Sequence, residues 1–440
     1  MKKLISNWNN YPIVEADEIS FDYDPELSEK LNGSATIPHG NGRCYGDASL
    51  SACVINTLRF DKILSFDIQQ GIITCQSGLL LSDLLQVIIP YGWFLPVTAG
   101  TKFITVGGAV ASDIHGKNHH VDGSFSRHVK QMTVLTGIGK MSCTKEDHTD
   151  LFASTCGGMG LTGVILEVTF ELKKIQTSFM RQKQIKADNL DEVMVLFAEH
   201  CDHTYSVAWI DCLKTGRKAG RSILILGEHA SEIEVPKSKR NLLVKEKSLF
   251  SVPFHLPGFL LNEWSVRAFN AMYYAKNRSK VTEGVIHYDG FFYPLDSIMH
   301  WNRIYGRRGF VQYQFVLPLK SSREGLQKIL ARINRMGMGS FLAVLKLFGE
   351  QDDLISFPME GYTLALDFPM RPGLLRFLNE LDDVVAEFGG RIYLSKDARM
   401  KKEIFWETYP HAQQFREILR KYDPGNRFVS NLSKRLMLKD

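Results

Sequence analysis

The segment from Thr105 to His120 reads TVGGAVASDIHGKNHH and combines small residues with chemically versatile side chains. Glycine and other small residues let a backbone approach a bound ligand closely. Three histidines, a lysine and an asparagine then follow within six positions, and such side chains can move protons or hydrogen-bond a ligand. We therefore expect a flat or phosphorylated ligand at this segment.

A metal site is the competing interpretation of these histidines. His115 and His119 stand four residues apart, but Gly116 between them disfavours a helix, and the glutamate of an HExxH motif is missing. Histidines on a turn are also often plain surface residues. We rank contact with a polar ligand first, surface exposure second, and a metal-dependent hydrolase using His115, His119 and His120 last.

Two more glycine-rich segments, 39–46 (HGNGRCYG) and 157–163 (GGMGLTG), occur in the same half of the chain. The first does not fit the dinucleotide fingerprint, because its spacing is GxGxxxG and no apolar helix follows it. A single loop of this kind is usually only a tight turn. Its backbone N–H groups can nevertheless bind pyrophosphate oxygens, and three such segments together favour a nucleotide-like ligand.

Lys346 (VLKLFG) and Lys396 (YLSKDAR) lie in apolar, strand-like surroundings. Such a lysine either points to solvent or is held in a site with an altered pKa, and the local pattern leaves both open.

Composition excludes several classes of protein. Of the 440 residues, 44% are hydrophobic and 23% charged, which is typical of a globular protein of one or two domains. The net charge of +5 is too small to indicate nucleic-acid binding, and no nucleic-acid motif is present. Seven cysteines without a CxxC pair argue against a disulfide framework or a structural zinc site. With no apolar run behind the N-terminal lysines and no spanning stretch, we expect a reduced, cytoplasmic protein.

Residues 237–264 have the composition of a membrane-contact segment. Basic residues (Lys237, Lys239, Arg240, Lys245, Lys247) precede large apolar ones (Phe250, Phe254, Phe259, Leu260, Trp264). Basic side chains attract anionic headgroups, and exposed aromatic rings can insert shallowly. A solvated loop beside a buried apolar segment explains the composition equally well.

The predicted elements change in character near residue 176. Before it, short strands alternate with glycine turns, and a helix capped by Ser82 is predicted to run to Gly92. After it, amphipathic helices over 188–202, 321–337 and 374–390 alternate with strands, the first helix opening at Asp188 or Asn189. This order predicts helices packed on one face of an antiparallel sheet, within an α+β fold.

Several segments, in order from about residue 38 to the end, resemble the vanillyl-alcohol oxidase/p-cresol methylhydroxylase (PCMH) family of flavoproteins. They are PHGNGRCYGD, PVTAGTKFITVGGAVASDIHGKNHHVDGSFSRHV, FFYPLD, GFVQYQFVLP, FLAVLKLFG, LDFP, GGRIYLSKDAR and DPGNRFVSNLSKRL. The resemblance implies a two-subdomain PCMH-type FAD-binding domain from residues 1–175, completed by 391–440, with a substrate domain at 176–390.

The resemblance also implies roles for individual residues. Lys396 and His115 would be catalytic, and the substrate would contact Tyr45, Lys117, Gln312, Gln314 and Lys346. FAD would be bound by Gly40, Asn41, Gly42, Arg43, Cys44, Tyr45, Gly100, Thr101, Thr105, Gly107, Ser112, His115, Asn118, Gly158, Gly163 and Tyr393. Many relatives bind FAD covalently through a histidine in the first loop; Arg43 stands there, so we expect non-covalent FAD.

Within the family, the chain is most similar to oxidases of a polyprenyl-phosphoryl ribose that act in cell-wall arabinan synthesis. This implies oxidation of the C2 hydroxyl of a lipid-linked pentose to the 2-keto sugar, the first half of an epimerisation that a short-chain NAD(P)H-dependent reductase would complete. It also implies peripheral association with the inner membrane from the cytoplasm, the periplasmic face remaining open. Ala365 and Thr363 replace the expected cysteine and asparagine, which implies an altered wall of the sugar pocket. The alternative is an aldonolactone or alditol oxidase acting on a soluble sugar.

Overall fold

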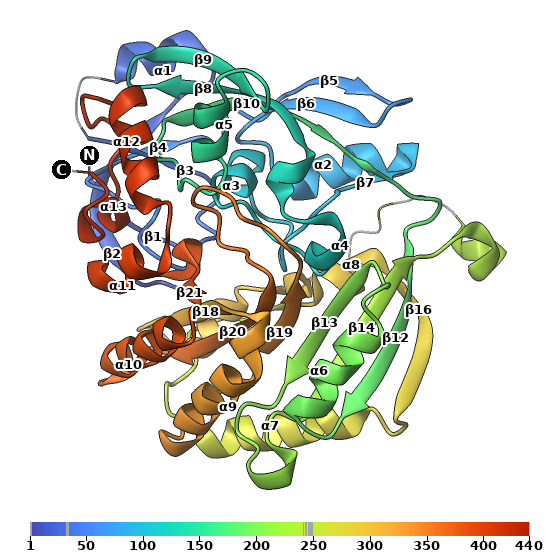
Figure 1. The fold of residues 1–440 in the computed structure, drawn as a ribbon. Helices are drawn as coiled ribbons and strands as arrows, with labels where there is room; N and C mark the ends of the chain where they lie inside the picture. Colours follow the sequence, from blue (N-terminus) through green and yellow to red (C-terminus); the bar gives the residue numbers. More distant parts are fainter. Residues whose placement is uncertain (1, 32–34, 241, 243, 245–249, 440) are drawn as a thin grey trace.

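The computed structural model describes residues 2–31, 35–240, 242, 244 and 250–439. Two small sheets are built from the first part of the chain, and one large sheet from the middle (Figure 1). The C-terminal helices lie beside the N-terminal part, at the opposite end of the sequence. Within the described residues, no helix is both long enough and apolar enough to cross a bilayer.

The first small sheet has the order β1-β2-β4-β3 and the second has the order β5-β6-β10-β8-β9. In the first sheet, β4 runs parallel to both β2 and β3, while all neighbours in the second sheet are antiparallel. The strands are β1 (Lys3–Ser6), β2 (Ile13–Ser20), β3 (Ile37–His39), β4 (Cys53–Asn56), β5 (Ile63–Asp67), β6 (Ile72–Gln76), β8 (Val129–Thr136), β9 (Gly139–Thr144) and β10 (Val164–Glu171).

Short helices and a two-stranded ribbon connect these strands. They are α1 (Asp24–Lys30), α2 (Leu81–Ile88), α3 (Val106–Ala111), α4 (His119–Asp122), α5 (Thr149–Thr155), and the ribbon of β7 (Trp93–Phe94) with β11 (Lys173–Lys174). The prediction that Ser82 caps α2 is wrong, because the helix begins at Leu81 and Leu80 is its N-cap. The N–H groups of Leu81 and Ser82 instead donate to the carbonyls of Ile104 and Lys102, so loop backbone replaces a side-chain cap.

The large sheet has eight antiparallel strands in the order β16-β12-β14-β13-β19-β20-β18-β21. They are β12 (Phe179–Ala187), β13 (Tyr205–Ile210), β14 (Ser222–His229), β16 (Val281–His287), β18 (Phe310–Pro318), β19 (Ala343–Phe348), β20 (Gly361–Pro369) and β21 (Arg391–Ile392). A further short pair is formed by β15 (Phe250–Ser251) and β17 (Ile298–Met299).

Amphipathic helices cover one face of this sheet, as predicted (Figure 1). The helices on this face are α6 (Leu190–Glu199), α9 (Leu319–Arg335) and α10 (Leu374–Glu387). The same part of the chain also contains α7 (Glu263–Lys276) and α8 (Tyr288–Phe292). Asn189 is the N-cap of α6 and its side chain accepts a hydrogen bond from the N–H of Glu192. In α9, Leu326, Ile329, Leu330 and Ile333 recur at helical spacing and are buried against the sheet.

The last part of the chain returns to the N-terminal sheets. It contains α11 (Lys402–Thr408), α12 (Ala412–Tyr422) and α13 (Asn431–Arg435). Thr36 pairs with Phe428 in a parallel bridge, and α12 packs against α5. Its first strand, β21, nevertheless pairs with β18 of the large sheet, so this segment contacts both parts of the molecule.

Candidate functional site

Register in the large sheet gathers the predicted substrate residues on one face. Gln312 pairs with Asp367, Gln314 with Ala365, and Lys346 with Thr363. Directly paired residues in antiparallel strands point to the same side of a sheet, and residues two apart on one strand do so as well. The strands β18, β19 and β20 therefore present one polar surface, and the departures at Thr363 and Ala365 lie on it.

His115 packs against this surface from the loop after α3. Its Nε2 lies 2.9 Å from Nε2 of Gln314, so the imidazole accepts a hydrogen bond from the amide and carries its own proton on Nδ1. Burial, together with the charges of Lys346 and Lys396, lowers the pKa of His115 well below its usual value. The imidazole is therefore neutral, and its buried Nδ1 has no hydrogen-bond partner among the described residues.

Lys396 lies at the end of a short turn of 3-10 helix, Leu394–Lys396. Its ammonium group is 3.8 Å from the centre of the Tyr45 ring, a cation–π contact. Burial lowers the pKa of Lys396 to about 7, and the nearby carboxylate of Asp367 partly opposes this. A lysine with such a pKa is well suited to accept a proton near neutral pH.

Two further lysines, each half-buried, lie at the site. Burial and the charge of Lys346 lower the pKa of Lys117 to about 7, and burial lowers the pKa of Lys346 to about 8. Nζ of Lys117 donates to the carbonyl of Phe291 and lies over that ring. Neighbouring positive charges make the charged form of each lysine less favourable, so an anionic ligand would stabilise the site.

Asp367 is a site residue that the sequence analysis did not identify. It is buried, and its carboxylate accepts hydrogen bonds from Gln312 (2.7 Å) and from the hydroxyl of Tyr305 (3.2 Å). Burial raises its pKa to about 6, against the hydrogen bond from Gln312 and the charge of Lys396. An acidic residue within the apolar strand TLALDFP was the available signal.

Three glycine-rich loops meet around α3, where FAD was predicted. Nδ2 of Asn41 donates to the carbonyl of Phe103 (2.8 Å), which joins loop 40–46 to loop 100–104. On the other side of α3, the N–H of Gly157 donates to the carbonyl of Val110 (3.0 Å). The residues that face outward here, 40–44, 100–104 and 111–112, are half-buried or exposed, so their backbone is accessible to a cofactor.

Individual glycines explain how closely these loops pack. A Cβ on Gly40 would lie 2.6 Å from Oγ1 of Thr105, and one on Gly107 would lie 2.7 Å from Cβ of Ser77. Gly42 has a positive φ of 58°, whereas Gly100 faces open space. The Thr105 side chain caps α3 by accepting from the N–H of Gly108, and the N–H of Phe103 donates to Thr101.

Tyr393 connects the glycine-rich part of the site to the large sheet. Its N–H donates to the carbonyl of Gln314 (2.9 Å), and its hydroxyl donates to the carbonyl of Ser112 (2.7 Å). The ring stacks on Phe357 with centroids 4.5 Å apart and lies 5.1 Å from the ring of His115. Together with the unpartnered Nδ1 of His115, the glycine loops and this aromatic wall fit a flat cofactor with a pyrophosphate.

Several other predicted cofactor residues make contacts within the protein. Arg43 stacks on Trp8, with its guanidinium carbon 3.9 Å from the ring centre, and Cys44 contacts Ser49 at 3.2 Å. The buried amide of Asn118 donates to Pro96 (2.8 Å) and Asp122 (2.6 Å).

The two glycines expected near the adenosine are tightly packed. A Cβ on Gly158 would lie 1.9 Å from the carbonyl oxygen of Ser154, and a Cβ on Gly163 would lie 2.2 Å from that of Leu135. Their contact with FAD stays a prediction.

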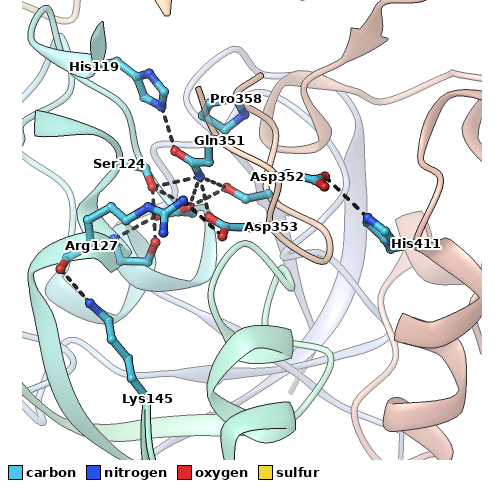
Figure 2. A network of polar contacts seen from close by, with 12 residues as sticks. His119, Ser124, Arg127, Lys145, Gln351, Asp352, Asp353, Pro358 and His411 are labelled. Atoms are coloured by element: carbon cyan, nitrogen blue, oxygen red, sulfur yellow. Dashed lines mark hydrogen bonds and ion pairs between the residues drawn. The ribbon is translucent and has the colours of Figure 1, made fainter. Parts of the chain in front are cut away.

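The three histidines of HGKNHH do not converge on a common point. Nε2 of His119 lies 2.8 Å from Oε1 of Gln351, and the amide nitrogen Nε2 of Gln351 donates to Ser124 and Asp353 (Figure 2). His120 bonds the carbonyl of His203 (2.9 Å), while His115 bonds Gln314. Burial lowers the pKa of His119 to about 4. The arrangement therefore gives no support to the metal-dependent hydrolase.

Arg435, in α13, connects the two segments that carry Tyr45 and Lys396. No sequence signal indicated this residue. Its guanidinium donates to both carboxylate oxygens of Asp47 (3.2 and 2.8 Å) and forms an ion pair with Asp397 at 2.8 Å. Asp47 follows Tyr45 by two residues, and Asp397 follows Lys396. Arg435 thus connects the two backbone segments that carry the cation–π pair, Tyr45 and Lys396.

The predicted membrane-contact segment exposes large apolar side chains. The exposed fractions are 82% for Phe250, 63% for Phe254, 73% for Phe259, 44% for Leu260 and 80% for Trp264. Lys245 and Lys247, which were part of the same prediction, lie outside the described residues.

Comparisons with known proteins identify the cofactor. Residues 30–144 match the family model described as FAD binding domain, which confirms the predicted cofactor. The chain is 36% identical to the decaprenylphosphoryl-beta-D-ribose oxidase of Mycolicibacterium smegmatis, over 99% of this chain and 98% of that protein. It is 32% identical, over 81% of its length, to a whole Streptomyces coelicolor protein from the mprA 5′ region. Mouse L-gulonolactone oxidase is 22% identical over 92% of this chain and 90% of its own.

Proposed function

Because the chain belongs to the decaprenylphosphoryl-beta-D-ribose oxidase family, we propose that it oxidises the C2 hydroxyl of a polyprenyl-phosphoryl pentose to a 2-keto sugar. The chain is an FAD-dependent oxidoreductase, and FAD, when bound, supplies the hydride acceptor. The observation that carries the proposal is the placement of Lys396, with its lowered pKa, near the neutral His115.

Each residue has a task that follows from its environment. Lys396, neutral in a large fraction of molecules near pH 7, accepts the proton of the C2 hydroxyl. Nδ1–H of His115 orients the ligand, because it is buried and has no partner among the described residues. Gln312, Gln314 and Lys346 line the sheet wall, and Lys117 with Tyr45 completes the sugar side. The positive charge of the half-buried Lys117 and Lys346 favours a phosphorylated substrate over a neutral one.

We assign FAD binding to residues 1–175 together with 391–440, and substrate binding to residues 176–390. The family match at 30–144 and the side chains of β18, β19 and β20 support this division. Thr363 and Ala365 shape the wall of the sugar pocket. Oγ1 of Thr363 donates to the carbonyl of Phe315 (2.8 Å) and accepts from Gln314 (3.2 Å), so it holds the amide that orients His115.

The lipid carrier requires access to a membrane, and we propose that residues 237–264 provide it. The exposed Phe259 and Trp264 support this, together with the exposed Lys237 and Arg240 that precede them. We place the enzyme at the cytoplasmic face of the inner membrane, with the periplasmic face as the alternative. A separate short-chain NAD(P)H-dependent reductase would reduce the 2-keto product to the epimeric alcohol.

The second candidate is an aldonolactone or alditol oxidase, which the similarity to L-gulonolactone oxidase favours. Anaerobic reduction of the flavin by a panel of polyprenyl-phosphoryl pentoses and free aldonolactones separates the two. Fast bleaching by the lipid-linked sugars alone supports the proposal. Fast bleaching by lactones alone overturns it in favour of the alternative.

A further inference from the structure

The turn that follows α6 brings three metal-binding side chains together outside the proposed active site. His200 is the C-cap residue of the helix, and Asp202 and His203 follow it. One ligand atom from each residue lies within 4.8 Å of the other two. In the part of the chain that the structure describes, no other three histidine, cysteine or acidic side chains come together in this way.

The three side chains already lie close enough to one another to approach a shared ion. The two imidazole rings meet edge to face with centroids 5.4 Å apart, and Nδ1 of His203 lies 3.2 Å from Oδ1 of Asp202. A backbone hydrogen bond from the N–H of His203 to the carbonyl of His200 (3.2 Å) closes the turn. The histidines are half-buried, whereas the Asp202 side chain is 81% exposed and can move toward an ion that approaches from solvent.

We propose that His200, Asp202 and His203 bind one divalent transition-metal ion of the Zn²⁺ class, with water completing its coordination. Two imidazoles and one carboxylate suit Zn²⁺, whereas Mg²⁺ and Ca²⁺ prefer oxygen ligands. Zinc–ligand distances are about 2.0–2.2 Å, so the three ligand atoms, which lie within 4.8 Å of one another, would rotate inward to bind a shared ion. Nothing in this site depends on FAD or on the proposed substrate.

The turn also supports the loop that carries Lys117. His120 bonds the carbonyl of His203 (2.9 Å), and the N–H of Ser206 donates to the carbonyl of Lys117 (2.8 Å). An ion that fixes the turn in its folded conformation binds the native state preferentially, and so raises the melting temperature. The site is thus structural, and it lies next to the predicted substrate loop.

Zinc titration of the chelator-treated, FAD-loaded protein tests the proposal by calorimetry. We expect one equivalent to bind, with His200→Gln or His203→Gln weakening binding by about tenfold or more. His411→Gln is the matched control, because His411 lies 3.4 Å from Asp352 without a second imidazole. Cys201→Ser controls for the exposed thiol inside the turn. Both controls should bind like the parent protein.

The variants keep the flavin spectrum as a measure of folding, and melting curves give a second readout. Zinc should raise the melting temperature of the parent and of both controls, and not that of the His200→Gln/His203→Gln double variant. Magnesium at the same concentration should have no effect. Unchanged zinc affinity in the double variant, or no saturable binding to the parent, overturns the proposal.

Discussion

The ammonium group of Lys396 lies 3.8 Å above the centre of the Tyr45 ring. Burial favours the neutral amine and lowers the pKa of Lys396 to about 7, while the nearby carboxylate of Asp367 partly opposes this shift. Backbone contact holds the pair together, since the N–H of Tyr45 donates to the carbonyl of Ser395 (2.9 Å). This relationship is the basis of the first three predictions.

Replacing Lys396 by alanine should leave FAD bound and reduce the rate of flavin reduction by about 10²–10⁴-fold, the usual contribution of a general base. Anaerobic stopped-flow absorbance with the lipid-linked sugar measures this rate. Lys401→Ala, at an exposed lysine nearby, is the control and should behave like the parent. Normal flavin reduction in Lys396→Ala would refute the catalytic role.

The rate of flavin reduction should rise with pH through an apparent pKa near 7, because the proposed proton acceptor is the neutral form of Lys396. Asp367 raises the pKa of Lys396, so Asp367→Asn should move this rise to lower pH. Rate–pH profiles of the parent and the variant give the comparison. A profile that does not move would show that the carboxylate has no electrostatic effect on the base.

Arg435→Met should lower the free energy of unfolding by about 3–5 kcal/mol, because two buried carboxylates lose their shared cation. It should also slow flavin reduction in the molecules that stay folded, since Tyr45 and Lys396 lose their common support. Urea denaturation and single-turnover kinetics measure the two effects. Arg427→Met, at an exposed arginine, should change neither. Adding Asp47→Asn to Arg435→Met should restore part of the stability.

The flavin should be released when the protein is precipitated with acid, because the family resemblance predicts Arg43 at the position where many relatives have a covalently bonded histidine. An arginine side chain stacked on Trp8 offers no such bond. Absorbance of the supernatant and of the pellet shows where the flavin is. Yellow colour retained in the pellet would disprove non-covalent binding.

Phe259→Asp and Trp264→Asp should each weaken binding to anionic vesicles by about tenfold, because each removes a large apolar side chain that would leave water. Vesicle co-sedimentation at low and high salt measures binding, while the flavin spectrum reports folding. Val195→Asp introduces the same charge at an exposed position on α6 and serves as the control. Equal binding by all three variants and the parent would argue against the membrane surface.

Patterns in neighbouring residues predicted the helices and caps that depend on contacts between neighbouring residues. The periodicity of α6 and α9 and the cap at Asn189 follow from neighbouring residues. The cap at Ser82 was wrong because the first turn of α2 bonds a loop about 20 residues away. Asp367 and Arg435 were missed for the same reason, since their partners lie on other strands or at the other end of the chain. Motif resemblance, not periodicity, indicated Lys396 and His115.

The docking of loop 40–46 onto residues 395–397 has a consequence for biosynthesis. A Cβ on Gly46 would lie 1.8 Å from the carbonyl of Asp397, so this loop and that late segment fit against each other without space to spare. A ribosome delivers the loop some 350 residues before its partner. This contact therefore forms only after residues 395–397 have been synthesised, and a chain truncated before them would lack the surface against which Gly46 packs.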